Sequence, residues 1–315
     1  MLSRRQLLLA TTMGTAPRAN KMTAKERVDR ALKGQDVDRP PFTFWHHFRL
    51  EAFPGERHAA RTLEFHRRYR TDLVKVMSDY PYPKGAGGLR GLKVEANPFP
   101  EQVRALEIIR DGLGGSAYFI ETIFNPYNQA GKIASKQEVE RLRQESPREL
   151  LDALEAIAKS EANHARRALE IGAAGIFLAI DNHPQLTPEE YAKFSEPFDR
   201  LVLEAAREAK LNVIHLHGER IYIDRFYAGW PAAVLNYEAH LTKIPLAEAR
   251  RNYAGVLMGG IDEVNFRKLT EAELGEQWHA AQRAAGARFI LAPGCSVPDQ
   301  STEEELSRLP RLLGA

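Results

Sequence analysis

The chain has 315 residues, of which 43% are hydrophobic and 27% charged, a composition typical of a globular protein. Lysine and arginine total 44 against 42 acidic residues, and this formal charge of +2 lacks the cationic excess typical of nucleic-acid binding. The single cysteine, Cys295, excludes an internal disulfide framework and leaves a buried thiol, a metal ligand or a nucleophile as its role.

The first 19 residues resemble a twin-arginine export signal. Arg4 and Arg5 precede an apolar run of about ten residues, too short to span a bilayer, and small residues follow up to Ala16. We expect residues 1–19 to be a signal segment, cleaved after Ala16 or Ala19, that directs the protein to the periplasm. A basic leader on a cytoplasmic protein is the alternative.

The folded part is expected to begin with a helix. Thr23 and Glu26 form a capping-box pattern, the helix should run through Leu32, and Gly34 should end it. Eight strand-like segments follow, most of them short continuous apolar runs, as expected of parallel strands buried on both faces. These predicted strands are 41–45, 73–77, 118–123, 175–180, 211–216, 232–236, 255–258 and 288–291.

The clearest helices between the strands are 147–171, 187–210, 270–285 and 301–313. The last three open with the capping-box pairs Thr187 and Glu190, Thr270 and Glu273, and Ser301 and Glu304. Strands followed by helices predict an α/β fold, a single (β/α)8 TIM barrel over residues 20–315. A doubly wound open sheet is the alternative, although no Gly-x-Gly-x-x-Gly turn follows the first strand.

In such a barrel the functional site lies at the C-terminal ends of the strands, where this chain carries many polar residues. Asp181 and Asp262 have loop capping as an equally good explanation, and of the adjacent His46 and His47 at most one can face the pocket. The catalytic candidates, which would orient the substrate or move a proton, are Asp79, Tyr80 and Glu238. The substrate-binding candidates are His46, Tyr127, Asp181, Tyr237 and Asp262.

Three residues at strand ends have the chemistry of metal ligands. His215 and His217 are two apart, so they share one face of a strand, as a chelating pair must. Cys295 follows the last predicted strand. Three protein ligands with one open position are the pattern of a catalytic rather than a structural zinc site. A buried, satisfied histidine and a small buried cysteine are the alternatives.

From Thr23 to Leu313 the chain resembles the uroporphyrinogen decarboxylase superfamily, which includes corrinoid-linked, coenzyme M-type thiol methyltransferases. The resemblance rests on Glu26-Arg27-Val28, on Asp38-Arg39-Pro40-Pro41 and on Ser78-Asp79 after a strand. It rests also on Gly259-Gly260-Ile261-Asp262, similar to the family's Gly-Asn-hydrophobic-Asp turn, and on Gly294-Cys295-Ser296-Val297-Pro298. It implies a TIM barrel of the same kind, with Asp79 matching the aspartate that binds pyrrole NH groups in decarboxylases.

Departures from the family pattern favour the methyltransferase branch. The arginine-rich segment of decarboxylases is largely missing from residues 44–49, although buried substrate carboxylates need cations. Methyltransferases carry His-x-Cys-Gly and a later Gly-Cys that bind zinc; here His217 replaces the middle cysteine. With one thiolate fewer, a zinc-bound substrate thiol should be less nucleophilic.

We therefore expect a metal-dependent group-transfer enzyme, most simply a methyltransferase, with zinc on His215, His217 and Cys295. Its partners would be a small-molecule substrate and a corrinoid carried by another protein. We expect no nucleic-acid partner and no transmembrane segment. The sequence does not fix the oligomeric state, for which a homodimer is one option. The alternatives are a metal-independent decarboxylase that uses Asp79, and an exported non-catalytic barrel that binds a ligand or metal.

Overall fold

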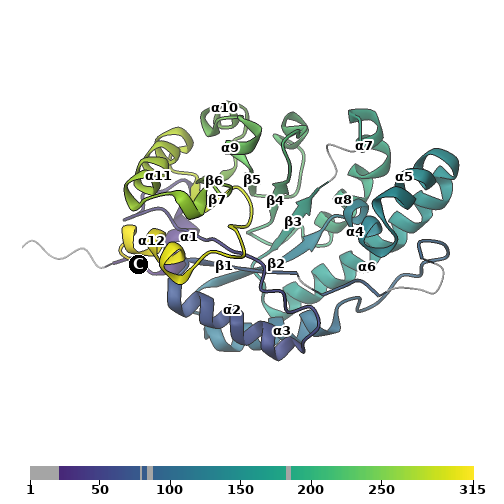
Figure 1. Ribbon diagram of the computed structural model, residues 1–315, viewed down its shortest axis with the longest axis horizontal. Coiled ribbons are helices and arrows are strands. Elements are labelled where there is room, and N and C mark those ends of the chain that lie inside the picture. Colours follow the sequence, from purple (N-terminus) through teal and green to yellow (C-terminus); the bar gives the residue numbers. More distant parts are fainter. Residues whose placement is uncertain (1–20, 79, 84–87, 182–185) are drawn as a thin grey trace, which may run out of the picture.

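The computed structural model describes residues 21–78, 80–83, 88–181 and 186–315, in which a curled parallel sheet is surrounded by helices (Figure 1). The strands are β1 (Leu73–Val76), β2 (Tyr118–Phe124), β3 (Ile176–Ile180), β4 (Val213–Leu216), β5 (Val234–Tyr237), β6 (Val256–Ile261) and β7 (Phe289–Pro293). The longer helices are α1 (Ala24–Lys33), α2 (Gly55–Tyr69), α3 (Pro100–Leu113), α5 (Lys136–Glu145), α6 (Pro147–Ile171), α11 (Glu271–Ala285) and α12 (Glu303–Leu312). The shorter ones are α4 (Pro126–Ile133), α7 (Pro188–Phe194), α8 (Glu196–Glu204), α9 (Ala239–Thr242) and α10 (Leu246–Asn252), with 3-10 turns η1 (Ile223–Phe226) and η2 (Phe266–Lys268).

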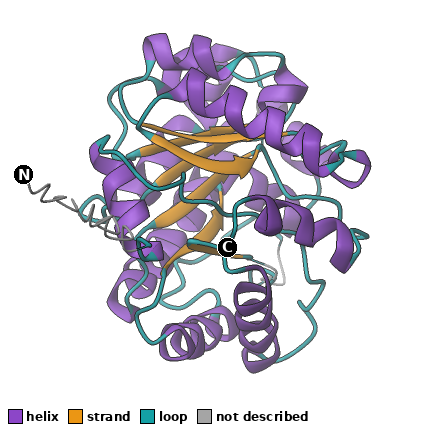
Figure 2. Cartoon of the chain, turned by 90° about the vertical axis from the view of Figure 1, so that its left-hand side faces the viewer, coloured by secondary structure: helices purple, strands orange, loops and turns teal. Residues whose placement is uncertain are grey.

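The seven strands lie in the order β1-β2-β3-β4-β5-β6-β7, and every neighbouring pair is parallel. This sequential order has no point where the winding reverses, so the doubly wound alternative is wrong. The sheet curls into a half-barrel with helices on its outer side (Figure 2). The predicted α/β class is confirmed, and seven of the eight predicted strands form.

The first predicted strand, residues 41–45, is reduced to a single bridge between Phe42 and Leu291. Thr43 N–H donates to Leu291 O at 3.0 Å, and Asp72 N–H donates to Phe42 O at 2.9 Å, so this segment lies between β7 and β1. It does not form a ladder because Pro41 has no N–H and the Phe42 N–H donates to the Asp72 carboxylate instead. A complete eight-stranded barrel is therefore not formed.

Helix starts follow the predicted capping patterns with two differences. Thr23, Thr187 and Thr270 each accept the predicted backbone hydrogen bond in a capping box. The last helix begins one residue later than predicted, with Thr302 as its N-cap. The predicted helix 187–210 is split at Ser195 into α7 and α8, because Pro197 cannot continue a helix that already runs through its preceding turn.

Alternate strand residues face the inside of the curl, here called the inner face. It carries an apolar cluster that includes Leu73, Ile120, Phe177, Val213 and Met258. The opposite face packs against the helices through residues such as Ile214 and Tyr237. Because strand side chains alternate, His215 and Asn236 lie on the inner face, two residues beyond Val213 and Val234.

No helix in the described part of the chain is long and apolar enough to cross a membrane.

Candidate metal centre

The three predicted ligands meet at the C-terminal end of the curled sheet. The ligand atoms of His215, His217 and Cys295 all lie within 4.8 Å of one another, and the Cys295 Sγ is 3.5 Å from His217 Nδ1. His215 is buried, whereas the other two side chains are partly exposed. The cluster therefore has one side anchored in the fold and one side open to solvent, as a site that admits a substrate needs.

Sheet curvature makes this meeting possible. His215 and His217 leave β4 on the same face, with ring centroids 5.9 Å apart. Cys295 follows β7, and β5 and β6 lie between β4 and β7 in the sheet. On a flat sheet three strand spacings of about 4.8 Å each would separate the two strands, so the sheet must curl to bring these ligands together.

His215 is held with one ring nitrogen available. Its ring stacks on Phe177 with centroids 5.1 Å apart, and its Nδ1 lies 2.7 Å from Asn236 Oδ1. The Asn236 amide nitrogen donates to Met258 O at 2.9 Å and Pro293 O at 3.2 Å, so its oxygen must face His215. His215 Nδ1 must then carry a proton, so Nε2 is the nitrogen left to bind a metal. This is the usual arrangement for a metal-binding histidine.

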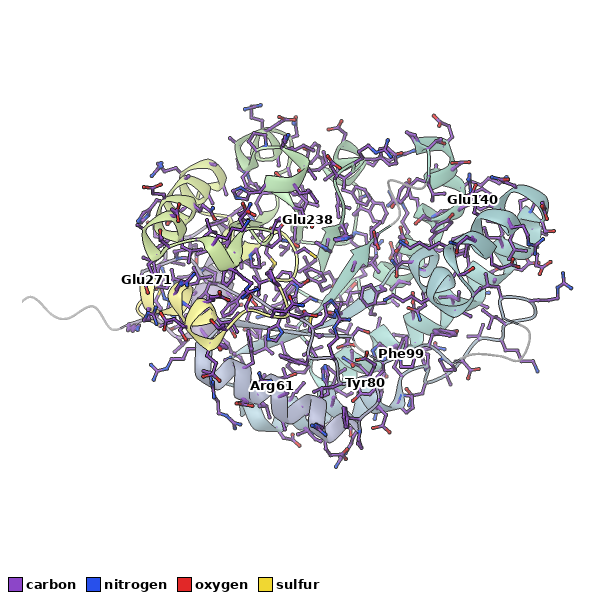
Figure 3. The ribbon with its side chains drawn as sticks, viewed as in Figure 1. Arg61, Tyr80, Phe99, Glu140, Glu238 and Glu271 are labelled. Carbon is purple, nitrogen blue, oxygen red and sulfur yellow. The ribbon has the colours of Figure 1, made fainter. Side chains whose placement is uncertain are left out.

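Glu238 joins the trio through His217. Its Oε2 lies 3.1 Å from His217 Nδ1 and accepts the Gly218 backbone N–H. Glu238 is 4% exposed, and burial raises the pKa of its carboxyl, but the hydrogen bond and the charge of His217 together with the Gly218 N–H lower it below its ordinary value. An anionic carboxylate therefore adjoins the two imidazoles and the thiol. Figure 3 shows Glu238 near the end of β5.

The electrostatics of the cluster suit a cation. Burial raises the pKa of the Cys295 thiol, but hydrogen bonds from His215 and His217 prevail and lower it to about 5. Hydrogen bonds to Cys295 and Glu238 raise the pKa of His217 to about 11. In the absence of metal, the group is thus a thiolate and a carboxylate that share one imidazolium, which leaves a net negative charge. A bound metal cation would balance this charge, since its ligands must be deprotonated.

The same atoms do not form a nucleophilic triad. In a cysteine–histidine–carboxylate triad, one ring nitrogen faces the thiol and the other faces the carboxylate. Here a single nitrogen, Nδ1 of His217, faces both Cys295 Sγ and Glu238 Oε2. The donor set therefore fits a metal ion better than a hydrolytic triad.

Two residues of this site were not among the predicted ones. Asn236 binds His215, and Glu263, 3% exposed, accepts the Gly294 N–H at 2.9 Å. Burial, together with the nearby negative charge of Glu238, raises the pKa of Glu263 to about 7. Strand periodicity could have identified Asn236, which shares a face with Val234. Nothing in the sequence singles out Glu263.

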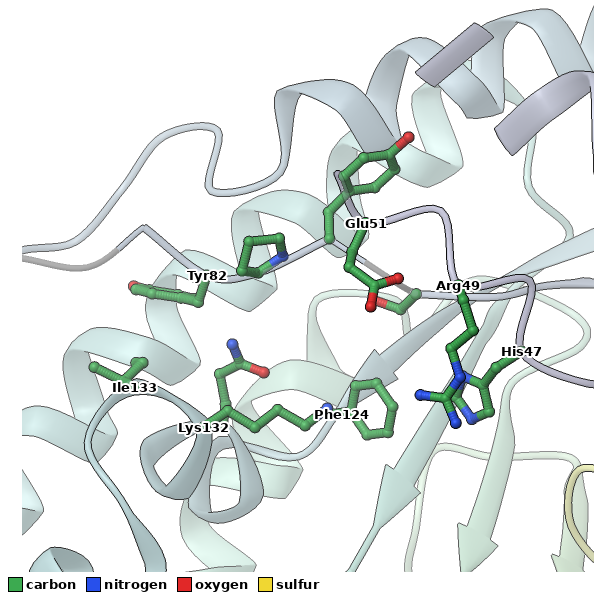
Figure 4. Close-up of a pocket in the computed structure, with 11 residues that line it drawn as sticks. His47, Arg49, Glu51, Tyr82, Phe124, Lys132 and Ile133 are labelled. Atoms are coloured by element: carbon green, nitrogen blue, oxygen red, sulfur yellow. The ribbon is translucent and has the colours of Figure 1, made fainter. Parts of the chain in front are cut away.

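A separate cavity of about 260 Å³ opens near the ends of β1 and β2 (Figure 4). His47 and Arg49 lie side by side at one end, and Tyr82 and Ile133 lie at the other. Tyr80 also lines this cavity, and its hydroxyl donates to Phe53 O at 2.9 Å. In Figure 3 Tyr80 lies well apart from Glu238, so these two catalytic candidates do not act on one atom.

The structure places His46 away from this cavity and its neighbour His47 on the cavity wall. His46 is 7% exposed and packs against Phe48 and Phe65, whereas His47 lines the cavity. The two side chains diverge because adjacent residues of an extended segment point in opposite directions.

The other predicted substrate-binding residues also lie outside the trio. Tyr237 is fully buried on the helix-covered face, where its hydroxyl donates to Ile244 O, and Tyr127 is 4% exposed in the same layer. Asp262 caps the next turn through the Asn265 N–H, as its alternative explanation proposed. Asp181 accepts a hydrogen bond from Asn128 at 2.9 Å. The catalytic candidate Asp79 lies outside the described residues.

A model of the uroporphyrinogen decarboxylase (URO-D) family matches residues 77–312, about three quarters of the chain. The chain belongs to the uroporphyrinogen decarboxylase family. The match confirms the resemblance drawn from the sequence motifs. It includes all three residues of the trio as well as Asn236, Glu238 and Glu263. A comparison with curated protein sequences gives no match.

Solved structures share the fold of this URO-D family member. A methyltransferase from Methanosarcina mazei has a TM-score of 0.77 at 17% identity, covering 92% of this chain and 98% of that one. A B12-independent methionine synthase from a Shewanella species has a TM-score of 0.58 at 12% identity, covering 87% and 93%. A putative vitamin-B12-independent methionine synthase from Listeria monocytogenes has a TM-score of 0.52 at 10% identity, covering 82% and 85%.

Proposed function

We propose that this URO-D family protein is a zinc-dependent group-transfer enzyme that transfers methyl groups. The observation that carries the proposal is the convergence of three donor atoms within 4.8 Å, on His215, His217 and Cys295. The Nε2 of His215 is left for a metal because Nδ1 contacts Asn236, and Cys295 supplies a thiol whose pKa is lowered to about 5. The structural likeness to a methyltransferase and to methionine synthases supports a group-transfer reaction.

Zinc, when bound, lowers the pKa of a coordinated thiol, hydroxyl or water and so supplies a nucleophile at neutral pH. The chain's own residues do the remaining work. Glu238 holds His217 and adds a negative charge beside it, which partly compensates for the thiolate that His217 replaces in the methyltransferase pattern. The partly exposed His217 and Cys295 leave the open side toward the substrate.

The methyl donor in this proposal is a corrinoid carried by a separate protein, and the acceptor is a small molecule. The 260 Å³ cavity with His47, Arg49 and Tyr80 on its wall is the proposed place for the rest of the acceptor. Arg49 is tied to Asp299 by a 2.8 Å hydrogen bond, and Asp299 follows Cys295 by four residues. That contact links the cavity wall to the loop that carries the thiol.

Metal analysis of purified protein tests the proposal. Wild type and the control His279→Ala, which changes an exposed histidine, should each hold about one zinc per chain. Cys295→Ser and His217→Ala should lose stoichiometric zinc. Full zinc occupancy in Cys295→Ser would show that the ligand assignment is wrong. Methylcobalamin and a small thiol then serve as probes of methyl transfer.

The family match itself favours a second candidate, a metal-independent decarboxylase. Zinc-free protein that converts uroporphyrinogen at an undiminished rate would establish this reaction in place of methyl transfer. Asp79, by the family pattern, would then be the essential residue.

We also propose that residues 1–19 direct export to the periplasm. These residues lie outside the described part of the chain. Replacing Arg4 and Arg5 together by lysine should retain the protein in the cytoplasm. Unchanged periplasmic recovery after cell fractionation would contradict the proposal.

A further inference from the structure

The Pro293–Gly294 peptide bond, one residue before Cys295, is held at both of its polar ends. Its carbonyl, Pro293 O, accepts a hydrogen bond from the Asn236 amide at 3.2 Å. Its N–H, on Gly294, donates to the Glu263 carboxylate at 2.9 Å. Asn236 is fully buried and Glu263 nearly so, so neither hydrogen bond can be replaced by bulk water without a rearrangement.

The same peptide is also confined sterically. A Cβ atom on Gly294 would lie 2.6 Å from the Glu238 Cα and 3.0 Å from Tyr237 O, both of which are backbone atoms of the β5 end. The chain therefore passes directly against β5 at this point. Two hydrogen bonds and this close approach together fix where the Cys295 side chain begins.

Asn236 connects that peptide to the first histidine. Its side-chain nitrogen donates hydrogen bonds to Met258 O and Pro293 O, while its oxygen accepts one from His215 Nδ1 at 2.7 Å. A flipped amide would place its oxygen against two carbonyl oxygens and its NH₂ against the imidazole. One side chain thus sets the tautomer of His215 and holds the backbone of the Cys295 strand.

We propose that Asn236, on β5, is a positioning residue that couples the His215 ligand on β4 to the Cys295 ligand after β7. Glu263 is the second anchor of the Pro293–Gly294 peptide that leads to Cys295. In this proposal both residues act through the metal ligands rather than on the substrate. The inference rests on the proposed metal centre, because these two residues are expected to hold two of its ligands in place. Outer partners of this kind commonly change metal affinity by about 10- to 100-fold.

The first test concerns the metal-free protein and does not depend on metal binding. Long-range ¹H–¹⁵N correlation spectra of histidine-labelled protein report which ring nitrogen carries the proton, and His215→Ala assigns the signals of His215. We expect a proton on Nδ1 in wild type and in the control Asn252→Ala, which alters an exposed asparagine. In Asn236→Ala the preference should be lost. An unprotonated Nδ1 in wild type would overturn the inference.

The second test measures zinc affinity by competition with a chelator. Asn236→Ala should weaken binding by about 10- to 100-fold, whereas Asn252→Ala should leave it unchanged. Glu263→Gln keeps an acceptor for the Gly294 N–H and should stay near wild type, while Glu263→Ala should weaken binding by about tenfold. Equal affinities of the Gln and Ala variants would refute the role of Glu263, and this comparison remains available if Asn236→Ala fails to fold.

Cobalt-substituted protein supplies a spectroscopic readout. A displaced Cys295 thiolate should weaken the thiolate-to-cobalt absorption in Asn236→Ala relative to Asn252→Ala, which a loss of stability alone would not do. Wild type that binds neither zinc nor cobalt would refute the proposed function. In that case the tautomer measurement would still decide whether Asn236 holds His215.

Discussion

The Cys295 thiol is predicted to ionise far below the usual pH. The hydrogen bonds from His215 and His217 lower its pKa to about 5 from an ordinary value of 9.0. At pH 7 such a thiol is roughly 99% thiolate, whereas an unperturbed one is roughly 1% thiolate, a difference of about a hundredfold. Removing one imidazole should raise the pKa of the thiol part of the way back to its ordinary value.

The assay is the pH dependence of iodoacetamide alkylation in metal-free protein. Because Cys295 is the only cysteine, every alkylation event reports on this site. Wild type should show an inflection near pH 5 and a plateau above it. In His217→Ala the inflection should rise by at least about one pH unit, equivalent to about 1.4 kcal/mol of lost thiolate stabilisation.

The control is His279→Ala, which removes an exposed imidazole on α11 and should leave the profile unchanged. Bound zinc should also protect the thiol from alkylation in wild type. A wild-type inflection near pH 9, or the same inflection in His217→Ala, would refute the reasoning. The shape of the profile is decisive rather than the rate itself, because a more acidic thiolate is intrinsically less nucleophilic.

Three further outcomes follow from the structure. Gly294→Ala places a methyl group against the β5 backbone, so it should lower the free energy of unfolding by about 1–3 kcal/mol and displace the Cys295 thiol. Thermal unfolding and zinc content equal to those of wild type would contradict this. Glu238→Gln removes the anion beside His217 and should lower the pKa of that imidazole, measured by NMR titration of zinc-free protein; an unmoved titration would exclude the contact. Burial raises the pKa of Asp199 from 3.8 to about 7, so the folded state keeps a proton that the unfolded state loses, and stability falls as pH rises through this window. Asp199→Asn has no titrating carboxyl at this position, so its free energy of unfolding, measured with denaturant, should fall by up to about 4 kcal/mol less than that of wild type over the same pH range. Equal pH dependence of unfolding in the two proteins would count against the raised pKa of Asp199.

Much of the fold and part of the site could be predicted from the sequence. Apolar runs located seven strands, and local hydrogen-bonding patterns located the helix starts at Thr23, Thr187 and Thr270. The spacing of His215 and His217 already placed them on one face, because strand side chains alternate with a fixed period. These features depend on neighbours a few residues away, so a single sequence contains the information.

Tertiary structure decided the rest. It reduced residues 41–45 to one bridge, since the Phe42 N–H found the Asp72 carboxylate, 30 residues away, instead of a strand partner. It turned Tyr237 toward the helices and Asn236 toward His215. The meeting of Cys295 with the histidine pair depends on the curl of a sheet that places two strands between them. Such contacts are set by packing between segments far apart in the chain, which is why local patterns could suggest the ligands but not their outer partners.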